Sequence, residues 1–220
     1  MSISAVFSAG GVVMWPLLAL SLIAIALILE RIIFWQRVTK RQNAMMRDVL
    51  YFYPRDLQAA LLKLEQNTDL PMARIFLAAI ELEQPTADEF RLALESAAQA
   101  ELPLLKRFGT FFETVINISP LLGLLGTILG LIQAFAALRL GDIGGTKTAG
   151  VTGGISEALI STVAGLALAV FTLLFANTFR GLYRRQLALI QEYGGKLELF
   201  YRRYYAHGRI PYLKLPKPDK

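Results

Sequence analysis

The 220-residue sequence contains no cysteine and a single histidine, His207. Without cysteine the chain forms no disulfide, thiolate metal site or iron–sulfur cluster, and it has no cysteine nucleophile. With one histidine, neither a histidine-ligated metal site nor a Ser–His–Asp triad is expected. Charged residues are also scarce, at 18%, whereas soluble domains carry about 25%. Because 55% of the residues are hydrophobic, the composition excludes a mainly disordered chain and an ordinary soluble domain.

Three stretches are long and apolar enough to cross a bilayer, which takes about 20 residues. They are residues 12–36, 108–138 and 154–180. The first stretch lacks the basic leading segment and the small-residue cleavage site of a signal peptide. We therefore interpret it as a retained helix.

The distribution of lysine and arginine predicts the orientation of these spans. Residues 1–11 carry none and the segment 139–153 carries two, whereas residues 37–107 and 180–220 carry ten each. The basic segments belong on the inner side, so we expect the N-terminus outside and the C-terminus inside. The net charge of +6 then favours contact with anionic lipid headgroups, and no nucleic-acid binding is expected.

The predicted fold class is an all-α membrane protein with three transmembrane helices. A helical cytoplasmic domain is expected from the loop between spans one and two, residues 37–107, together with the C-terminal helix. The parts outside the spans are an outer N-terminus (1–11), the inner helical region (37–107), an outer loop (139–153), and an inner C-terminal helix and tail (181–220).

The region 37–107 reads as a small helical bundle. Thr86 followed by Glu89 is a capping box, which predicts the start of a helix at this point. Pro103 is expected to bend that helix as it enters the second span. Prolines also separate the helix-like stretches, at Pro54, Pro71 and Pro85.

A heptad-like seam follows the third span and predicts that the helix continues. Two interpretations stay open: packing on the chain's own bundle, or self-association around a symmetry axis. Gly194 and Gly195 weaken the seam and mark a candidate bend. The seam residues, alternately four and three apart, are Tyr183, Leu187, Ile190, Gly194, Leu197, Tyr201 and Tyr204.

Small residues form a stripe on the second span and another on the third. Such stripes allow close helix packing, or they line a narrow path around another helix. A lone membrane threonine commonly bonds to a carbonyl of its own helix, but two stripes with a central hydroxyl favour a function for Thr127 and Thr162. The stripes are Gly123, Thr127, Gly130 and Ala134, and Ala158, Thr162, Gly165, Ala169, Thr172 and Ala176.

Glu157 is the only acid within the third span. It is either a helix-start residue, stabilised by the helix N-terminus and by Arg139 or Lys147, or a functional residue, which we favour. The functional role would be an entry group for cations or protons, or an ionic anchor inside a subunit interface. Neither stripe contains an acid at mid-depth, so a proton-conducting assembly would need one from another chain. Residues near the inner ends of the spans are interpreted as structural ion-pair partners, namely Glu30, Arg31 and Glu113.

Four blocks of this sequence resemble the ExbB/TolQ/MotA family of proton-driven stator channels. The blocks are residues 10–18, 29–31, 119–135 and 153–166. Three spans and a short tail are similar to ExbB and TolQ, whereas MotA-type stators have four spans and a larger cytoplasmic domain.

The resemblance implies a homopentamer in the bacterial inner membrane, in which spans two and three line a central pore. A single-span partner similar to ExbD or TolR would place its membrane aspartate in that pore, and a TonB- or TolA-like protein would be the periplasmic client. The family's pore threonines fall on Thr127 and Thr162, and its span-three glutamate on Glu157. The neighbouring glycines assigned to the pore lining are Gly123, Gly130 and Gly165.

The predicted function is therefore conversion of the proton motive force into mechanical work, without enzymatic activity, cofactor or metal. One departure is that many relatives have a proline near Val170 or Phe171, which leaves a straighter third span possible here. The alternative function is a non-conducting oligomeric scaffold for a single-span partner. A membrane enzyme using Glu157 is disfavoured, because no second acid or nucleophile accompanies it.

Overall fold

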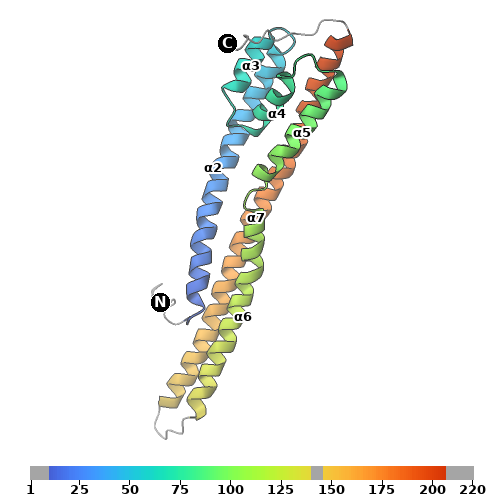
Figure 1. Cartoon of the computed structure of the whole chain (residues 1–220). Helices are drawn as coiled ribbons and strands as arrows, with labels where there is room; N and C mark the ends of the chain where they lie inside the picture. The colour runs from blue at the N-terminus through green and yellow to red at the C-terminus, as the bar shows by residue number, and fades with distance from the viewer. Residues whose placement is uncertain (1–9, 140–145, 207–220) are drawn as a thin grey trace, which may run out of the picture. The chain divides into compact units, whose positions relative to one another are not determined.

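A computed structural model describes residues 10–139 and 146–206 of the chain. Helices account for most of this part, and no strand occurs in it, which confirms the all-α fold class (Figure 1). The helices are α2 (Met14–Phe52), α3 (Leu57–Glu65), α4 (Pro71–Ile80), α5 (Ala87–Leu105), α6 (Gly109–Arg139) and α7 (Thr146–Ala206).

The chain divides into two compact units. The apolar unit comprises residues up to Arg31 together with Phe108–Arg180, and the polar unit comprises Ile32–Arg107 and the residues after Arg180. Three helical segments, starting at Met14, Ala87 and Gly150, are long and apolar enough to cross a membrane. The prediction of three candidate spans is thus confirmed.

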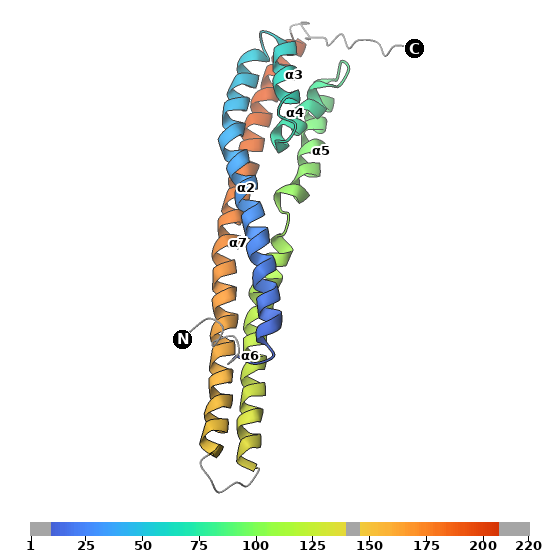
Figure 2. The ribbon, with the colours of Figure 1, turned by 90° about the vertical axis from the view of Figure 1, so that its left-hand side faces the viewer.

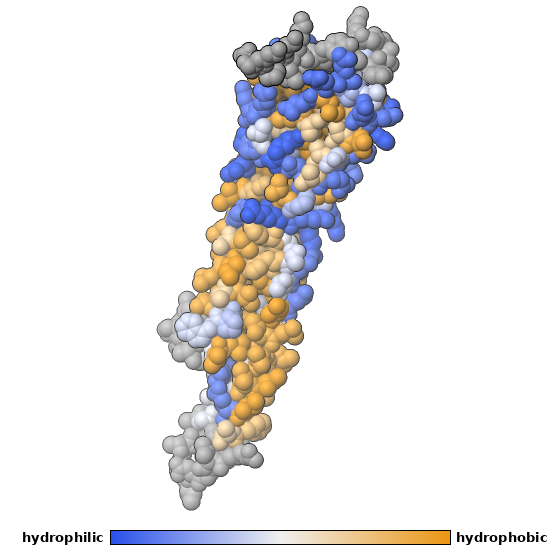
Figure 3. Space-filling view, viewed as in Figure 1, coloured by the Kyte–Doolittle hydropathy of each residue, from blue (hydrophilic) through white to orange (hydrophobic). Residues whose placement is uncertain are grey.

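In the apolar unit, α6 and the first half of α7 lie side by side and antiparallel in both views (Figure 2). Their mutual contact consists of small residues such as Gly123, Gly130 and Ala158. Large apolar side chains are exposed instead, for example Leu121 and Val163. Hydrophobic residues make up most of the visible surface of the apolar unit in Figure 3. Small residues at the helix contact and large apolar residues on the surface are the reverse of a water-soluble core, and this arrangement is typical of helices solvated by lipid.

Helix α7 begins earlier than the sequence suggested. The segment 139–153 was expected to be a loop, but α7 is helical from Thr146 onward, and residues 140–145 lie outside the described part. Glycines such as Gly150 and Gly153 give this segment a low helix propensity. In the structure, Gly154 instead allows the backbone of α7 to pack tightly on α6 at Gly130.

The polar unit is built around α4, of which 8 of 10 residues are buried. Pro71 occupies the first turn of α4, where its missing N–H costs no hydrogen bond. Asp56 caps α3 by accepting a hydrogen bond from the Ala59 amide. The predicted capping box is present, since Thr86 and Glu89 exchange both of its hydrogen bonds at the start of α5.

Pro103 lies inside α5, which ends at Leu105, and α6 begins at Gly109. The helix is therefore interrupted, not bent, on the way into the second span. Phe108 adopts a left-handed backbone with φ of 65°, which an α-helix does not accommodate.

The seam on α7 packs on the chain's own bundle, as the first of the two interpretations predicts, and self-association around a symmetry axis stays a prediction. Ile190 and Leu197 are buried in the polar unit, and Tyr201 stacks on Phe90 with ring centroids 4.3 Å apart. The Tyr201 hydroxyl also donates to the Pro85 carbonyl. The glycine pair within the seam does not interrupt α7, which is one helix from Thr146 to Ala206.

Tyrosines gather where the seam meets the loop before α3. The Tyr204 hydroxyl donates to the Pro54 carbonyl at 2.8 Å. Burial raises the pKa of Tyr53 well above its ordinary value, and neighbouring Tyr201 and Tyr204 act in the same direction. Tyr53 is therefore neutral at physiological pH and serves as a core residue.

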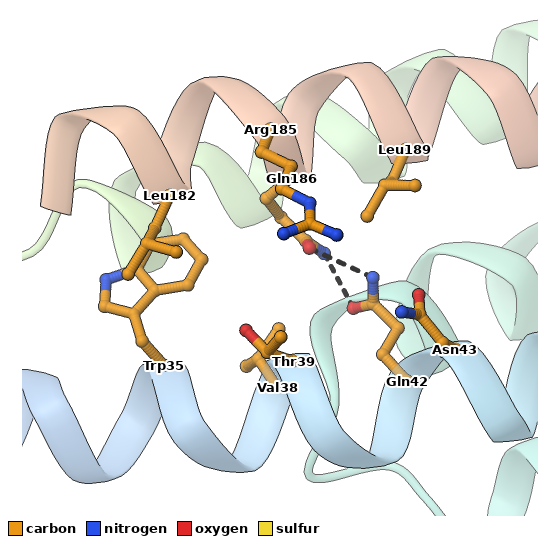
Figure 4. A pocket seen from close by; sticks show the side chains of 9 residues that line it. All are labelled: Trp35, Val38, Thr39, Gln42, Asn43, Leu182, Arg185, Gln186 and Leu189. Atoms are coloured by element: carbon orange, nitrogen blue, oxygen red, sulfur yellow. Dashed lines mark hydrogen bonds between the residues drawn. The ribbon is translucent and has the colours of Figure 1, made fainter. Parts of the chain in front are cut away.

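Two buried amides join α2 and α7 inside the polar unit. Gln42 Nε2 donates to Gln186 Oε1 at 3.0 Å, and Gln186 Nε2 donates back to Gln42 Oε1 at 2.6 Å (Figure 4). Trp35 and Leu182 lie in the same region of the two helices. Because each amide satisfies the other, the pair fixes the register of the two helices without leaving these groups unpaired.

Candidate functional site

The candidate site lies on α6 and α7 of the apolar unit, where the two predicted stripes meet. Three glycines of the predicted pore lining are buried between these two helices. A Cβ on Gly130 would lie 2.6 Å from the Gly154 carbonyl oxygen, and one on Gly123 would lie 3.1 Å from the Thr162 Cα. A Cβ on Gly165 would overlap the Ser119 carbonyl oxygen. Within the chain, Gly123, Gly130 and Gly165 therefore serve close helix packing.

Ser161 occupies the centre of the contact, and the sequence analysis missed it. Its side chain is 0% exposed, and its hydroxyl donates to the Ala158 carbonyl at 3.0 Å. The Gly123 carbonyl on α6 lies 3.4 Å from the same hydroxyl. A spacing of four and three residues fits Ser161 as well as Thr162, so the signal was present but ambiguous.

The two predicted threonines flank this contact and are half-buried. The Thr162 hydroxyl lies 3.1 Å from the Ala158 carbonyl oxygen and 3.3 Å from that of Gly123. The Thr127 hydroxyl donates to the Leu124 carbonyl at 2.6 Å. A carbonyl can only accept a hydrogen bond, so both threonine hydroxyls donate their protons to backbone carbonyls. Each hydroxyl oxygen can still accept a hydrogen bond from another group.

Glu157 contacts α6 and the residues that precede α2. Gln133 of α6 donates to its carboxylate, with Nε2 3.5 Å from Oε1. On the other side, a Cβ on Gly11 would overlap the same carboxylate oxygen. The structure thus brings together Glu157, Gln133 and Gly11, and it brings Thr162 next to Gly123.

The interpretation of Glu157 as a helix-start residue is wrong. Helix α7 begins at Thr146, so Glu157 is in the interior of the helix, about three turns from its N-terminus. The influence of a helix terminus decays within the first turn. Stabilisation of Glu157 by the end of its own helix is therefore excluded.

The three residues predicted to form ion pairs, Glu30, Arg31 and Glu113, differ in burial and in their contacts. Glu113 pairs with Arg180 at 3.1 Å, and Arg180 also donates to the Asn177 side chain. Arg31 is 2% exposed. One carboxylate oxygen of Glu30 is buried without a hydrogen-bond partner among the described residues. Across residues 10–139 and 146–206, no three acidic or histidine side chains form a metal site.

Comparison with known proteins identifies the family. Residues 67–192 match the MotA/TolQ/ExbB proton channel family. The chain belongs to this family. The matched segment contains Thr127, Glu157 and Thr162, so the candidate site lies within the part that defines the family.

Two relatives from Synechocystis sp. are similar over most of their length. The chain is 61% identical over 197 residues to the "Putative biopolymer transport protein ExbB-like 3", an alignment covering 90% of this chain and 94% of the relative. It is 40% identical over 212 residues to the "Putative biopolymer transport protein ExbB-like 1", covering 94% and 83%. The "Tol-Pal system protein TolQ" of Haemophilus influenzae is 36% identical over 111 residues, covering 49% and 45%.

Membership of the MotA/TolQ/ExbB family agrees with three apolar helices and describes a multi-pass membrane protein. The family consists of channel proteins that energise transport, and not of enzymes. The ExbB and TolQ members of the family work in general with partners of the ExbD or TolR type.

Proposed function

We propose that the chain is the channel-forming subunit of a proton-driven motor in a bacterial inner membrane. With an ExbD/TolR-like partner, it would convert the proton motive force into mechanical work on a TonB- or TolA-like protein in the periplasm. The observation that carries this proposal is the pair of membrane threonines, Thr127 and Thr162, whose oxygens are left as acceptors next to close-packed helices. Family membership and the biopolymer-transport relatives support the same function.

The proposed assembly is a homopentamer with the N-terminus of each subunit in the periplasm and the C-terminus in the cytoplasm. The bias of lysine and arginine towards residues 37–107 and 180–220 supports this orientation. The large apolar side chains exposed on α6 and α7 provide the surface that lipid or neighbouring subunits would cover.

In the proposed mechanism, a proton enters near Glu157 and reaches an acid of the partner helix. A buried carboxylate is costly in a membrane unless polar groups solvate it. The hydroxyl oxygens of Thr127 and Thr162 would accept hydrogen bonds from the protonated acid, and water would solvate its ionised form. Each change of charge would alter the contacts that the partner helix prefers and drive one step of rotation.

The test is the Thr127→Val/Thr162→Val double variant, purified with the single-span partner and reconstituted into liposomes. Valine keeps the shape of threonine and removes the hydroxyl. We expect proton flux to fall about ten-fold, because losing two neutral hydrogen bonds of about 0.5–1.5 kcal/mol each corresponds to a factor of about that size. The native mass of the complex should not change.

The matched control is Thr178→Val. Thr178 also lies on α7, is exposed, and bonds to the carbonyl of Leu174 in its own helix. This variant should conduct as the wild type does. Full flux in the double variant would refute the threonine role, and a wild-type complex without proton flux would favour the non-conducting scaffold.

A further inference from the structure

The turn that precedes α2 brings the head of the first span into contact with α7. Gly11 has a left-handed backbone, with φ of 72°, and its carbonyl accepts a hydrogen bond from the Met14 amide at 3.2 Å. Non-glycine residues adopt this backbone conformation rarely. The turn is therefore specified by glycine even before its surroundings are considered.

The second constraint on Gly11 comes from Glu157. A Cβ on Gly11 would overlap both Oε1 and Cδ of the Glu157 side chain and would lie 2.9 Å from Cγ. The carboxylate thus lies directly on the glycine backbone. Gly10 adds a related contact, because its Cβ would lie 3.1 Å from a methyl group of Ile160, one turn further along α7.

The turn cannot retreat from α7 without disturbing the packing of the first span. Val13, Met14 and Leu17 are buried directly after the turn. Their neighbours come from both α6 and α7: Leu122, Leu129, Ala164 and Leu168. The glycine turn and the Glu157 carboxylate are consequently held against each other by the start of α2.

We propose that Gly11 is a positioning residue for Glu157. The glycine turn closes one side of the carboxylate while Gln133 donates to it from α6. The first span thereby acts on the proton path without contributing a polar side chain to it. The role of Glu157 in conduction rests on the function proposed above, whereas its placement by Gly11 is tested independently of proton flux.

The experiment measures how fast a hydrophobic carbodiimide modifies Glu157 in the purified full-length complex, read by peptide mass spectrometry. Glu113, which is largely exposed, is the reference within the same molecule. In Gly11→Ala and Gly11→Asn, the new Cβ should displace the carboxylate from the turn. We expect the ratio of Glu157 to Glu113 modification to rise about five-fold, the factor that corresponds to about 1 kcal/mol.

Two controls separate this contact from other effects of replacing a glycine. Asparagine tolerates a positive φ better than alanine does, so a change shared by both variants arises from the Cβ and not from backbone strain. Gly153→Ala, one turn before Glu157 on α7, places its Cβ in open space and should leave the ratio unchanged.

An unchanged ratio in both Gly11 variants, with native mass retained, would overturn the proposal. An equal rise of the modification ratio in Gly153→Ala would also overturn the proposal, since the effect would then not be specific to the contact between Gly11 and Glu157. If Glu157→Gln conducts protons normally while the Gly11 variants still change the ratio, positioning stands and only the conduction role of Glu157 fails.

Discussion

The two units of this chain fill their interiors with opposite kinds of side chain. Between α6 and α7, the apolar unit buries small residues such as Gly123, Ser161 and Gly165, and many large residues of these two helices face outward. The polar unit buries large residues such as Phe76 and Phe90 and presents a mostly hydrophilic surface in Figure 3.

This difference follows from the solvent of each unit. In water, burying large apolar side chains is itself the driving force, worth about 25 cal/mol per Å² of apolar surface. In lipid that force is absent between helices, and close backbone approach provides the attraction instead. The polar unit should therefore be sensitive to lost volume, and the apolar unit to added volume.

The largest expected effect is from Phe76→Ala in the polar unit. Phe76 is fully buried, so the variant should lose about 3–5 kcal/mol of unfolding free energy. Urea unfolding of the detergent-purified chain measures this loss by fluorescence. In a Trp15→Phe background, Trp35 is the remaining tryptophan and reports on the polar unit.

The exposed Leu92 is the matched control on α5, and Leu92→Ala should remain within about 0.5 kcal/mol of the wild type. A similar loss from both substitutions would mean that buried volume does not stabilise the polar unit.

The reciprocal change in the apolar unit is Gly130→Ala. The added Cβ would meet the Gly154 carbonyl oxygen at 2.6 Å and the Ala158 nitrogen at 2.8 Å, so the helices must separate. We expect a loss of about 3 kcal/mol, the upper end for overpacking a close contact. Thermal unfolding in detergent, followed by circular dichroism, checks it.

Gly153→Ala is again the control, because it should be neutral or stabilising by about 1 kcal/mol from helix propensity. Leu124→Ala on the outward face of α6 tests whether the apolar unit tolerates lost volume, and it should have little effect on the unfolding free energy. If Gly130→Ala were as stable as Gly153→Ala, close packing of α6 on α7 would not be what holds this unit together.

A smaller effect is expected from Gln42→Leu, which leaves the buried side-chain amide of Gln186 without its hydrogen-bond partner. The unpaired amide should cost about 2 kcal/mol. Replacing both residues, in Gln42→Leu/Gln186→Leu, removes the unpaired group and should restore most of the stability. Trp35 fluorescence in urea measures the double variant and the two single variants, Gln42→Leu and Gln186→Leu. Simple addition of the two single losses would show that the amides act independently.

The sequence predicted much of this architecture. The spans followed from apolar runs, because a bilayer demands a fixed length of uncharged chain. The capping box at Thr86 was readable because its hydrogen bonds join residues three apart. The extension of α7 to Thr146 was not readable, because glycine-rich helices are stabilised by packing that propensity does not report.

The candidate site divides in the same way. Thr127, Thr162 and Glu157 could be singled out because polar groups are rare within apolar spans. The sequence could not tell which small residues of α7 face α6, because adjacent positions such as Ser161 and Thr162 differ by only about 100° around the helix. The structure places Ser161 at the centre of the contact and Thr162 at its edge.

By itself, the sequence determined the helical class, the number of candidate spans and the absence of thiol chemistry, since each depends on composition or local order. Only the tertiary structure decided that the seam on α7 covers the chain's own bundle and that Gln42 meets Gln186, 144 residues away. It also placed Glu157 against Gly11. Such contacts depend on how distant helices pack, and neither charge nor periodicity within one helix specifies the packing partner.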